Sequence, residues 1–355
     1  DTPSSRGLGD VYKRQSLHKT TIISIIIVYL VILAGGIVRM TGSGMGCPDW
    51  PKCFGFLIPP TERSQLDWKS NFDYNKNQII IIDEKLFYAN NSFKSKDKFD
   101  SFNWSKYTKH DYSKFNVYHT WIEYINRLIG AIAGLSVLIL FFISLKFIKT
   151  KKLISALSFL ALIAILFQAW LGKTVVDSNL TANTITVHML MAIVLLFILF
   201  SILAFSNTKK LKFKISKNIS LLVLLSLGLL LIQIITGTEV RKFIDIKMEF
   251  FNYIEKEKWI ENIPSTFSFH RSFSWSIIII NSVIYFKAIK NGLKSRLIYI
   301  VNFLIFLQII SGIIMYYFNF PFTSQPIHLL ISTLIIGIQF YFLLLYNISN
   351  NAIKI

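Results

Sequence analysis

Gln168-Ala169-Trp170-Leu171-Gly172 is followed, twenty residues after the glutamine, by His188. Gln308-Ile309-Ile310-Ser311-Gly312 is followed at the same interval by His328. Both stretches lie in strongly apolar sequence. An internal repeat decides the architecture, because each copy must fold as the same kind of unit. A histidine at the same place in both copies predicts a pair of equivalent metal or cofactor sites.

The repeat extends towards the N-terminus of each copy. Gly35-Gly36-Ile37-Val38-Arg39 has a counterpart in Gly237-Thr238-Glu239-Val240-Arg241, and Asn126-Arg127 has one in His270-Arg271. Each copy therefore has its landmarks in one order, which is Gly-x-x-Val-Arg, x-Arg, Gln-x-x-x-Gly and His. The intervals agree to within a few residues, except that the first copy has a long insertion between Arg39 and Arg127.

The composition predicts a membrane protein, because 53% of the 355 residues are apolar. A transmembrane helix needs about 20 apolar residues to cross about 30 Å of hydrocarbon. The candidate spans are Thr20–Val38, Thr120–Phe147, Leu153–Leu171, Thr184–Ser206, Ile219–Gly237, Phe267–Ala288, Leu297–Tyr317 and Ile327–Tyr346. We therefore predict an all-α integral membrane protein with eight transmembrane helices, arranged as two tandem four-helix bundles related by the internal repeat.

The net charge of +19 lies in short alternate loops rather than in a soluble basic domain. The lysines and arginines concerned are Lys13, Arg14, Lys19, Lys146, Lys149, Lys151, Lys152, Lys209, Lys210, Lys212, Lys214, Lys217, Lys287, Lys290, Lys294 and Arg296. These loops contain no acidic residue, which is the positive-inside pattern. Both termini are then expected in the cytoplasm, in a bacterial cytoplasmic (inner) membrane. Nucleic acid is excluded as a partner, because no soluble domain presents a basic surface.

Three regions follow from these boundaries. Residues 1–15 match neither a signal peptide nor the lysine- and isoleucine-rich sequence after them, and we interpret them as a non-native N-terminal segment. Residues 16–210 form the N-terminal four-helix half, with an extracytoplasmic loop at 39–118, and residues 211–355 form the C-terminal half. Within the loop, residues 61–117 are polar and aromatic, which predicts a cap over the outer face, partly disordered.

Cys47 and Cys53 are the only cysteines, and both follow the first span on the side expected to be oxidising. They are expected to form a disulfide across a short loop, and this bridge would be exposed and reducible. Two roles remain open, a structural staple and a redox-sensitive pair that exchanges with a thiol partner.

The topology places four histidines at one depth. His119, His188, His270 and His328 each lie near the start of a span that runs inwards, so all four lie close to the outer surface. A histidine inside a membrane segment indicates a functional site, although any single one can instead bond to a backbone carbonyl at the interface. Zinc or copper sites need three or four clustered nitrogen or sulfur ligands. A facing pair in a helical bundle fits the two axial positions of a haem better.

Arginines near these positions are candidates to neutralise haem propionates. Arg127 and Arg271 each follow the residue at the pair position of the second helix, and Arg39 and Arg241 are further candidates. An interfacial arginine is also often only an anchor whose side chain reaches towards the headgroups.

The copies differ where chemistry is expected. The second copy reads Phe267-Ser268-Phe269-His270-Arg271, whereas the first reads Glu123-Tyr124-Ile125-Asn126-Arg127. Helical spacing places His119, Glu123 and Asn126 on one face. Glu123 is a candidate to accept a proton or to stabilise positive charge, and the alternative is an ion pair with Arg127. Because amides are poor iron ligands, either His188 alone holds the first site or His119 supplies its second ligand.

Three groups of residues together resemble the haem A synthase family. They are Gly35-Gly36-Ile37-Val38-Arg39-Met40-Thr41-Gly42-Ser43-Gly44 through Pro59-Pro60, the stretch Glu123-Tyr124-Ile125-Asn126-Arg127-Leu128, and the duplicated Gln-to-His units. The resemblance implies an enzyme that oxidises a methyl group of haem O to the formyl group of haem A for cytochrome oxidase. It implies haem b held by His270 and His328, a substrate site with Glu123 as catalytic residue and His188 as ligand, and paired loop cysteines. The chain departs from the family pattern at Asn126, where a histidine is expected.

The partners expected are the lipid bilayer, an electron acceptor that the sequence does not identify and, from the resemblance, haem O synthase; a homo-oligomer stays open. One alternative is a dihaem b-type cytochrome that only transfers electrons, against which the single Glu123 argues. Another is a transporter built from repeats, which should have helices broken near the midplane. Neither copy contains a paired break of this kind.

Overall fold

The computed structural model describes residues 3–108, 115–206, 216–293 and 295–351. Its long helices are α1 (Pro3–Met40), α2 (Val117–Leu145), α3 (Lys152–Asp177), α4 (Ala182–Ser206), α5 (Lys217–Phe250), α6 (Ser265–Lys290), α7 (Arg296–Tyr317) and α8 (Ser324–Asn351). Within the described residues, these eight helices are each long and apolar enough to cross a membrane. The prediction of an all-α integral membrane protein is confirmed.

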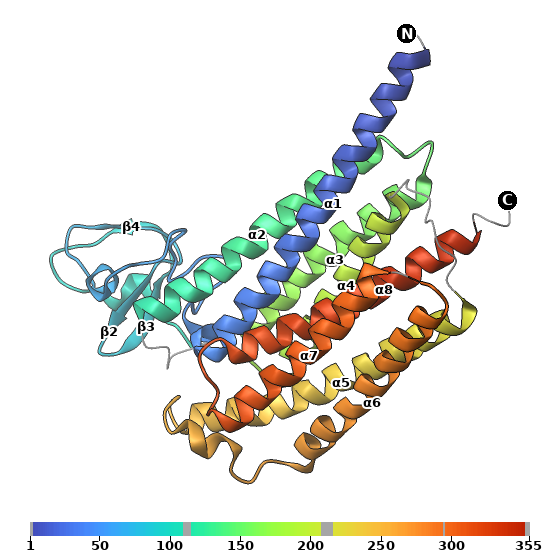
Figure 1. The fold of residues 1–355 in the computed structure, drawn as a ribbon. Coiled ribbons are helices and arrows are strands. Elements are labelled where there is room, and N and C mark those ends of the chain that lie inside the picture. Colours follow the sequence, from blue (N-terminus) through green and yellow to red (C-terminus); the bar gives the residue numbers. More distant parts are fainter. Residues whose placement is uncertain (1–2, 109–114, 207–215, 294, 352–355) are drawn as a thin grey trace.

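The helices pack as two groups of four, which lie side by side in Figure 1. In the first group, α1 contacts α2 and α4, and α3 contacts α2 and α4. In the second group, α5 contacts α6 and α8, and α7 contacts α6 and α8. Helices α2 and α4 are therefore diagonal to each other in one ring, as α6 and α8 are in the other. The two groups meet where α8 packs against α1 and α4.

The turns that follow the odd-numbered helices converge at one end of the molecule, which we call the disulfide end. The segment after α1 contacts all three of the other turns. The backbone N–H of Thr323 donates to Met40 Sδ at 3.2 Å. Gly42, with φ of 68°, lies against the ring of Tyr253, and Gly44 lies against Leu180, so that a side chain at either glycine would collide.

The opposite end of the bundle carries the described lysines of the loop between α2 and α3. Lys209, Lys210, Lys212, Lys214 and Lys294 lie outside the described residues.

The insertion after α1 folds as a small β-domain that projects from the disulfide end (Figure 1). Strands β2 (Ile79–Ile82), β3 (Lys85–Ala89) and β5 (Trp104–Lys106) form an antiparallel sheet in the order β2-β3-β5. Strands β1 (Asp73–Tyr74) and β4 (Phe93–Lys94) form a second antiparallel pair. Short 3-10 helices lie at Ser43–Met45, Arg63–Leu66, Ser101–Asn103 and Lys256–Ile260.

The β-domain has an apolar core of its own. Strand β2 is buried on both faces, because Ile79 and Ile81 pack towards the cysteines while Ile80 packs against Trp104 and Tyr74. This segment is a folded domain with a packed core, and the expected cap is therefore more ordered than its polar composition suggested. Residues 109–114, where the segment returns to α2, lie outside the described residues.

Helix α5 is longer than the predicted span Ile219–Gly237. The mixed-sign segment that begins at Glu239 remains helical to Phe250. An i,i+4 ion pair between Arg241 Nε and Asp245 Oδ1, at 2.7 Å, lies in this extension. Opposite charges at this spacing stabilise a helix, and the alternating signs of the segment are those of a helix end rather than of a loop.

Candidate functional site

The disulfide between Cys47 and Cys53 is present and lies beside the first turns of α2. The expectation that it would be exposed is wrong, because the two cysteines are 0% and 1% accessible. Phe54, Leu66 and Leu86 pack around them in the core of the β-domain. The bridge is therefore covered by the folded insertion.

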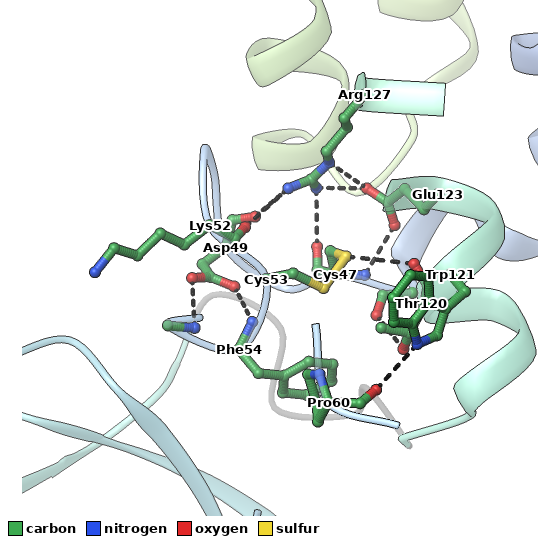
Figure 2. The surroundings of a disulfide bond; sticks show 12 residues. Cys47, Asp49, Lys52, Cys53, Phe54, Pro60, Thr120, Trp121, Glu123 and Arg127 are labelled. Carbon is green, nitrogen blue, oxygen red and sulfur yellow. Dashed lines mark hydrogen bonds and ion pairs between the residues drawn. A yellow bond between two sulfur atoms is a disulfide. The ribbon is translucent and has the colours of Figure 1, made fainter. Parts of the chain in front are cut away.

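Arg127 on α2 holds the disulfide loop, as Figure 2 shows. Its Nη1 donates to the backbone oxygens of Asp49 (2.6 Å) and Lys52 (3.0 Å), and its Nη2 donates to that of Cys47 (3.2 Å). Its Nε and Nη2 both donate to Glu123 Oε1. A guanidinium has five N–H donors, and all five are used here. Arg127 thus has no donor left for a haem propionate in this arrangement.

Glu123 is buried and joins the same network. It forms the i,i+4 ion pair with Arg127 that the sequence left open as an alternative. Its second oxygen, Oε2, accepts a hydrogen bond from the backbone N–H of Cys47 at 2.8 Å. Both oxygens are engaged, so the carboxylate ties α2 to the disulfide loop whatever else it does.

Asp49 stabilises the loop from its other side. Its carboxylate accepts hydrogen bonds from the backbone N–H groups of Phe54 (2.5 Å) and Gly55 (2.8 Å). Burial raises the pKa of Asp49, and these hydrogen bonds and Arg127 oppose that rise. Tyr107 donates to the backbone oxygen of Pro48 at 2.6 Å. Burial and the nearby Asp49 and Asp177 raise the pKa of Tyr107 to about 12.

A glycine faces the ligand position in each of the four helix pairs. A Cβ at Gly172 would meet His188 Cε1 at 3.5 Å, and one at Gly312 would meet His328 Cε1 at 3.6 Å. The contact at Gly237 is closer, with His270 Cε1 only 2.9 Å away. In the pair α1–α2, Gly35 faces Asn126, whose Oδ1 would lie 3.9 Å from such a Cβ.

These four contacts give Asn126 the same place in its helix pair as the three histidines have in theirs. The glutamine of the repeat is used in the same way, because Gln168 Nε2 donates to the backbone oxygen of His188, and Gln233 Nε2 to that of His270, both at 2.9 Å. Asn126 therefore replaces a histidine at an equivalent position rather than lying elsewhere on α2.

The histidines of the second half have hydroxyl partners. His328 Nδ1 lies 2.7 Å from Ser311 Oγ, which itself donates to the backbone oxygen of Gln308. His270 Nδ1 lies 3.2 Å from Thr236 Oγ1, which donates to the backbone oxygen of Gln233. If these hydroxyl hydrogens stay on the backbone oxygens, each imidazole donates through Nδ1, and this tautomer leaves Nε2 with a free lone pair, as an axial ligand requires.

His188 in the first half lacks this support. The residue before its glycine is Leu171, where the second half has Thr236 and Ser311. Its Nδ1 is buried with no hydrogen-bond partner among the described residues. Asn126 Oδ1, on the diagonally placed helix, is also buried and without a described partner. The first half thus contains two unsatisfied polar atoms at the place where the second half has two oriented imidazoles.

His119 lies at the start of α2, which begins where the Asn116 side chain accepts the backbone N–H groups of Tyr118 and His119. The His119 ring interacts with the Gly42 backbone, and a Cβ at Gly46 would collide with the His119 carbonyl. His119 is therefore packed against the segment after α1, two turns from Asn126.

Two of the predicted arginines meet across the halves. Arg39 on α1 donates through Nε to Asp245 Oδ2 at 2.6 Å, and Arg241 on α5 pairs with the other oxygen of Asp245. Arg241 Nη2 is buried with no described hydrogen-bond partner, so it retains a donor for a bound anion. Arg271 is exposed and stacks on the Phe267 ring at 5.7 Å. Within the described residues, no group of three or more His, Cys, Asp or Glu side chains forms a metal centre.

Sequence reasoning missed several of these residues. Gln233-x-x-x-Gly237 is a third copy of the Gln-x-x-x-Gly pattern and could have been recognised in the sequence. Thr236 and Ser311 were also readable as the hydroxyl residues before the glycines. The spacing of Asp245 from Arg241 was a local signal for their ion pair, but the contact of Asp245 with Arg39 had none, because Arg39 is distant in the chain.

The fold and the site define a multi-pass membrane protein with two four-helix halves. Each half has histidines in the part of its helices that lies towards the disulfide end. The family model described as cytochrome oxidase assembly protein matches residues 18–340. The chain therefore belongs to this family.

Individual relatives agree with this assignment. A heme A synthase of Shewanella oneidensis is 28% identical over 219 residues, a match that covers 61% of this chain and 54% of that protein. A heme A synthase of Rickettsia prowazekii is 24% identical over 342 residues, covering 89% of this chain and 93% of the relative. One of Wolbachia pipientis wMel is 26% identical, covering 90% and 89%.

Proposed function

We propose that this protein is a haem A synthase, an oxidoreductase that converts the C8 methyl of haem O to a formyl group by successive hydroxylation. The haem A formed would serve cytochrome oxidase. Family membership and the names of the relatives support this function. The observation that carries it is the difference between the halves, because one has two oriented imidazoles and the other has His188, Asn126 and a buried carboxylate.

The second half has the residues to hold a haem b. His270 and His328 come from diagonal helices, each with Nδ1 bonded to a hydroxyl. The glycines opposite them leave room for the imidazoles. A haem b bound there would supply one-electron transfer. Thr236 and Ser311 would keep both imidazoles in the ligating tautomer.

The first half is proposed as the site of the substrate, haem O. His188 would bind one face of the substrate, whereas Asn126 is a weak ligand and leaves the other face accessible. Glu123 lies one helical turn before Asn126 on α2, which supports a role at the reacting edge. Because Arg127 and the Cys47 N–H hold it as a hydrogen-bond acceptor, Glu123 is proposed to receive a proton when the methyl group is oxidised.

The membrane placement is also a proposal. A bacterial cytoplasmic membrane with both termini in the cytoplasm is supported by the lysines at the end opposite the disulfide. The disulfide end would then face the oxidising side. Haem O synthase is the proposed supplier of the substrate, since the enzyme that makes haem O from haem B must act first. A homo-oligomer is compatible with this arrangement.

Co-expression with an enzyme that forms haem O, followed by chromatography and mass spectrometry of the extracted haems, tests the function. We expect haem A or its hydroxylated intermediate from the wild type. Glu123→Gln should abolish both products and keep haem b, whereas Glu84→Gln, at a carboxylate in the exposed β2–β3 turn, should change nothing.

The loop network needs its own check, because Glu123 also holds the disulfide loop. The glutamine variant keeps an oxygen that can accept the Cys47 N–H, and unchanged protease resistance of the β-domain would show that the fold is retained. Two inert haems b and no haem A from the wild type would reject the synthase and leave an electron-transfer cytochrome.

A further inference from the structure

A cavity of about 220 Å³ lies at the disulfide end, between the two halves. It is lined by Met40, Thr41, Tyr253, Lys256, Trp259, Phe320, Phe322 and Gln325. These residues come from the end of α1, the α5–α6 turn and the start of α8 with the turn before it. The cavity is separate from the Glu123 network, whose residues do not line it.

Gln325 is the informative residue of this cavity. Its side chain is only 9% exposed, and both amide atoms, Oε1 and Nε2, are buried with no hydrogen-bond partner among the described residues. A buried amide without partners is costly. A ligand that offers an acceptor to Nε2, a donor to Oε1, or each in turn would remove this cost.

Part of the cavity wall is aromatic. Trp259 and Phe320 pack against each other, with ring centroids 5.6 Å apart and ring planes at 41°. Lys256 Nζ lies 5.9 Å from the Trp259 ring and donates to the Phe320 oxygen at 3.2 Å, which places its charge beside the aromatic rings. A cavity of about 150 Å³ in another protein holds benzene. The volume of about 220 Å³ is therefore sufficient for a head group of one or two rings.

We propose that this cavity binds the head group of a membrane quinone and that Gln325 is its hydrogen-bond partner. A quinone carbonyl accepts from Nε2, and the hydroxyl of the reduced form can donate to Oε1, so the amide serves both redox forms. A carboxylate would leave Oε1 unpaired because it only accepts, and a hydrocarbon chain would leave both amide atoms unpaired. Gln325 lies three residues before His328, on the same face of α8.

This site would supply the electron acceptor, and that part of the inference rests on the proposed function. The first oxidation balances as –CH₃ + H₂O + quinone → –CH₂OH + quinol. Two C–H electrons and two protons pass to the quinone, and water supplies the oxygen. The second hydroxylation balances with another water and a second quinone, as –CH₂OH + H₂O + quinone → –CH(OH)₂ + quinol, and loss of water from the diol gives –CHO.

The test measures binding of a short-chain quinone to the purified full-length holoprotein, by equilibrium dialysis and by quenching of tryptophan fluorescence. Gln325→Leu should weaken binding about tenfold or more, which corresponds to about 1.4 kcal/mol. Phe322→Ala, in the lining and 70% exposed, should also weaken it. Phe318→Ala is the matched control, because Phe318 is 67% exposed and does not line the cavity.

The haem absorption spectrum of each variant separates a quinone site from an extension of the haem pocket. A Gln325→Leu protein with weaker quinone binding and an unchanged haem spectrum supports the proposal. Absence of quinone binding to the wild type overturns it, as does a changed haem spectrum with unchanged quinone affinity. Quinone binding by a protein that makes no haem A would reject the synthase alone, and haem A formation without quinone binding would reject the cavity assignment alone.

Discussion

Replacement of Gly237 by alanine tests the glycine contact that positions His270. The new Cβ would lie 2.9 Å from His270 Cε1, whereas carbon atoms pack at about 3.5–4.0 Å. The imidazole must therefore retreat by roughly half an ångström or more. That movement lengthens the present 3.2 Å contact between His270 Nδ1 and Thr236 Oγ1 beyond hydrogen-bonding distance.

The energetic consequences oppose each other in the apoprotein. The lost hydrogen bond costs about 0.5–1.5 kcal/mol, and overpacking costs about 1–3 kcal/mol. Alanine in place of glycine inside a helix returns about 0.5–1 kcal/mol. The Gly237→Ala protein should therefore be less stable by about 0.5–4 kcal/mol. Haem affinity should fall more, by about 10–100-fold, as is typical when the partner of a ligating histidine is lost.

The assay is haem b content and the reduced-minus-oxidised spectrum of purified protein, with thermal unfolding in detergent as the check on folding. Gly172→Ala and Gly312→Ala are the matched controls, because their Cβ atoms would lie at 3.5 and 3.6 Å from the facing rings, within ordinary contact distance. Both variants should keep the haem b content of the wild type. If Gly237→Ala binds haem b as well as the wild type, or if Gly312→Ala loses it equally, the contact argument is refuted.

Three further predictions concern the other parts of the site. Asn126→His should place a second imidazole opposite His188, so that spectra of the first half become those of a six-coordinate low-spin haem; an unchanged spectrum would contradict the equivalence of the four positions. Ser311→Ala removes the partner of His328 Nδ1 and should lower haem b affinity about 10–100-fold, measured by haem retention during dilution. Since burial raises the pKa of Asp49, the folded disulfide loop binds the proton more tightly than the unfolded loop. Its stability should be greatest below the ordinary Asp pKa of about 4 and should fall as pH rises through the raised value, seen as faster disulfide reduction by a phosphine, and this trend should be absent in Asp49→Asn.

The membrane architecture was predictable from local sequence. Each span is a continuous apolar run, and a run of that length has one stable structure in a bilayer, because the backbone must satisfy its own hydrogen bonds. The predicted span Ile219–Gly237 stops short of the end of α5, because the charged residues that follow it continue the helix to Phe250.

The sequence by itself determined the eight helices and the asymmetry between Asn126 and His270, because these depend on hydrophobic length and residue identity. Only the tertiary structure decided the partners of the polar groups. Arg127 could have paired with a propionate or with protein, and the choice was made by three carbonyl oxygens of a loop 75 to 80 residues away. The Gln325 cavity is likewise formed by segments from both halves. Hydrogen bonds and cavities depend on distances of a few tenths of an ångström between remote segments, which no local pattern encodes.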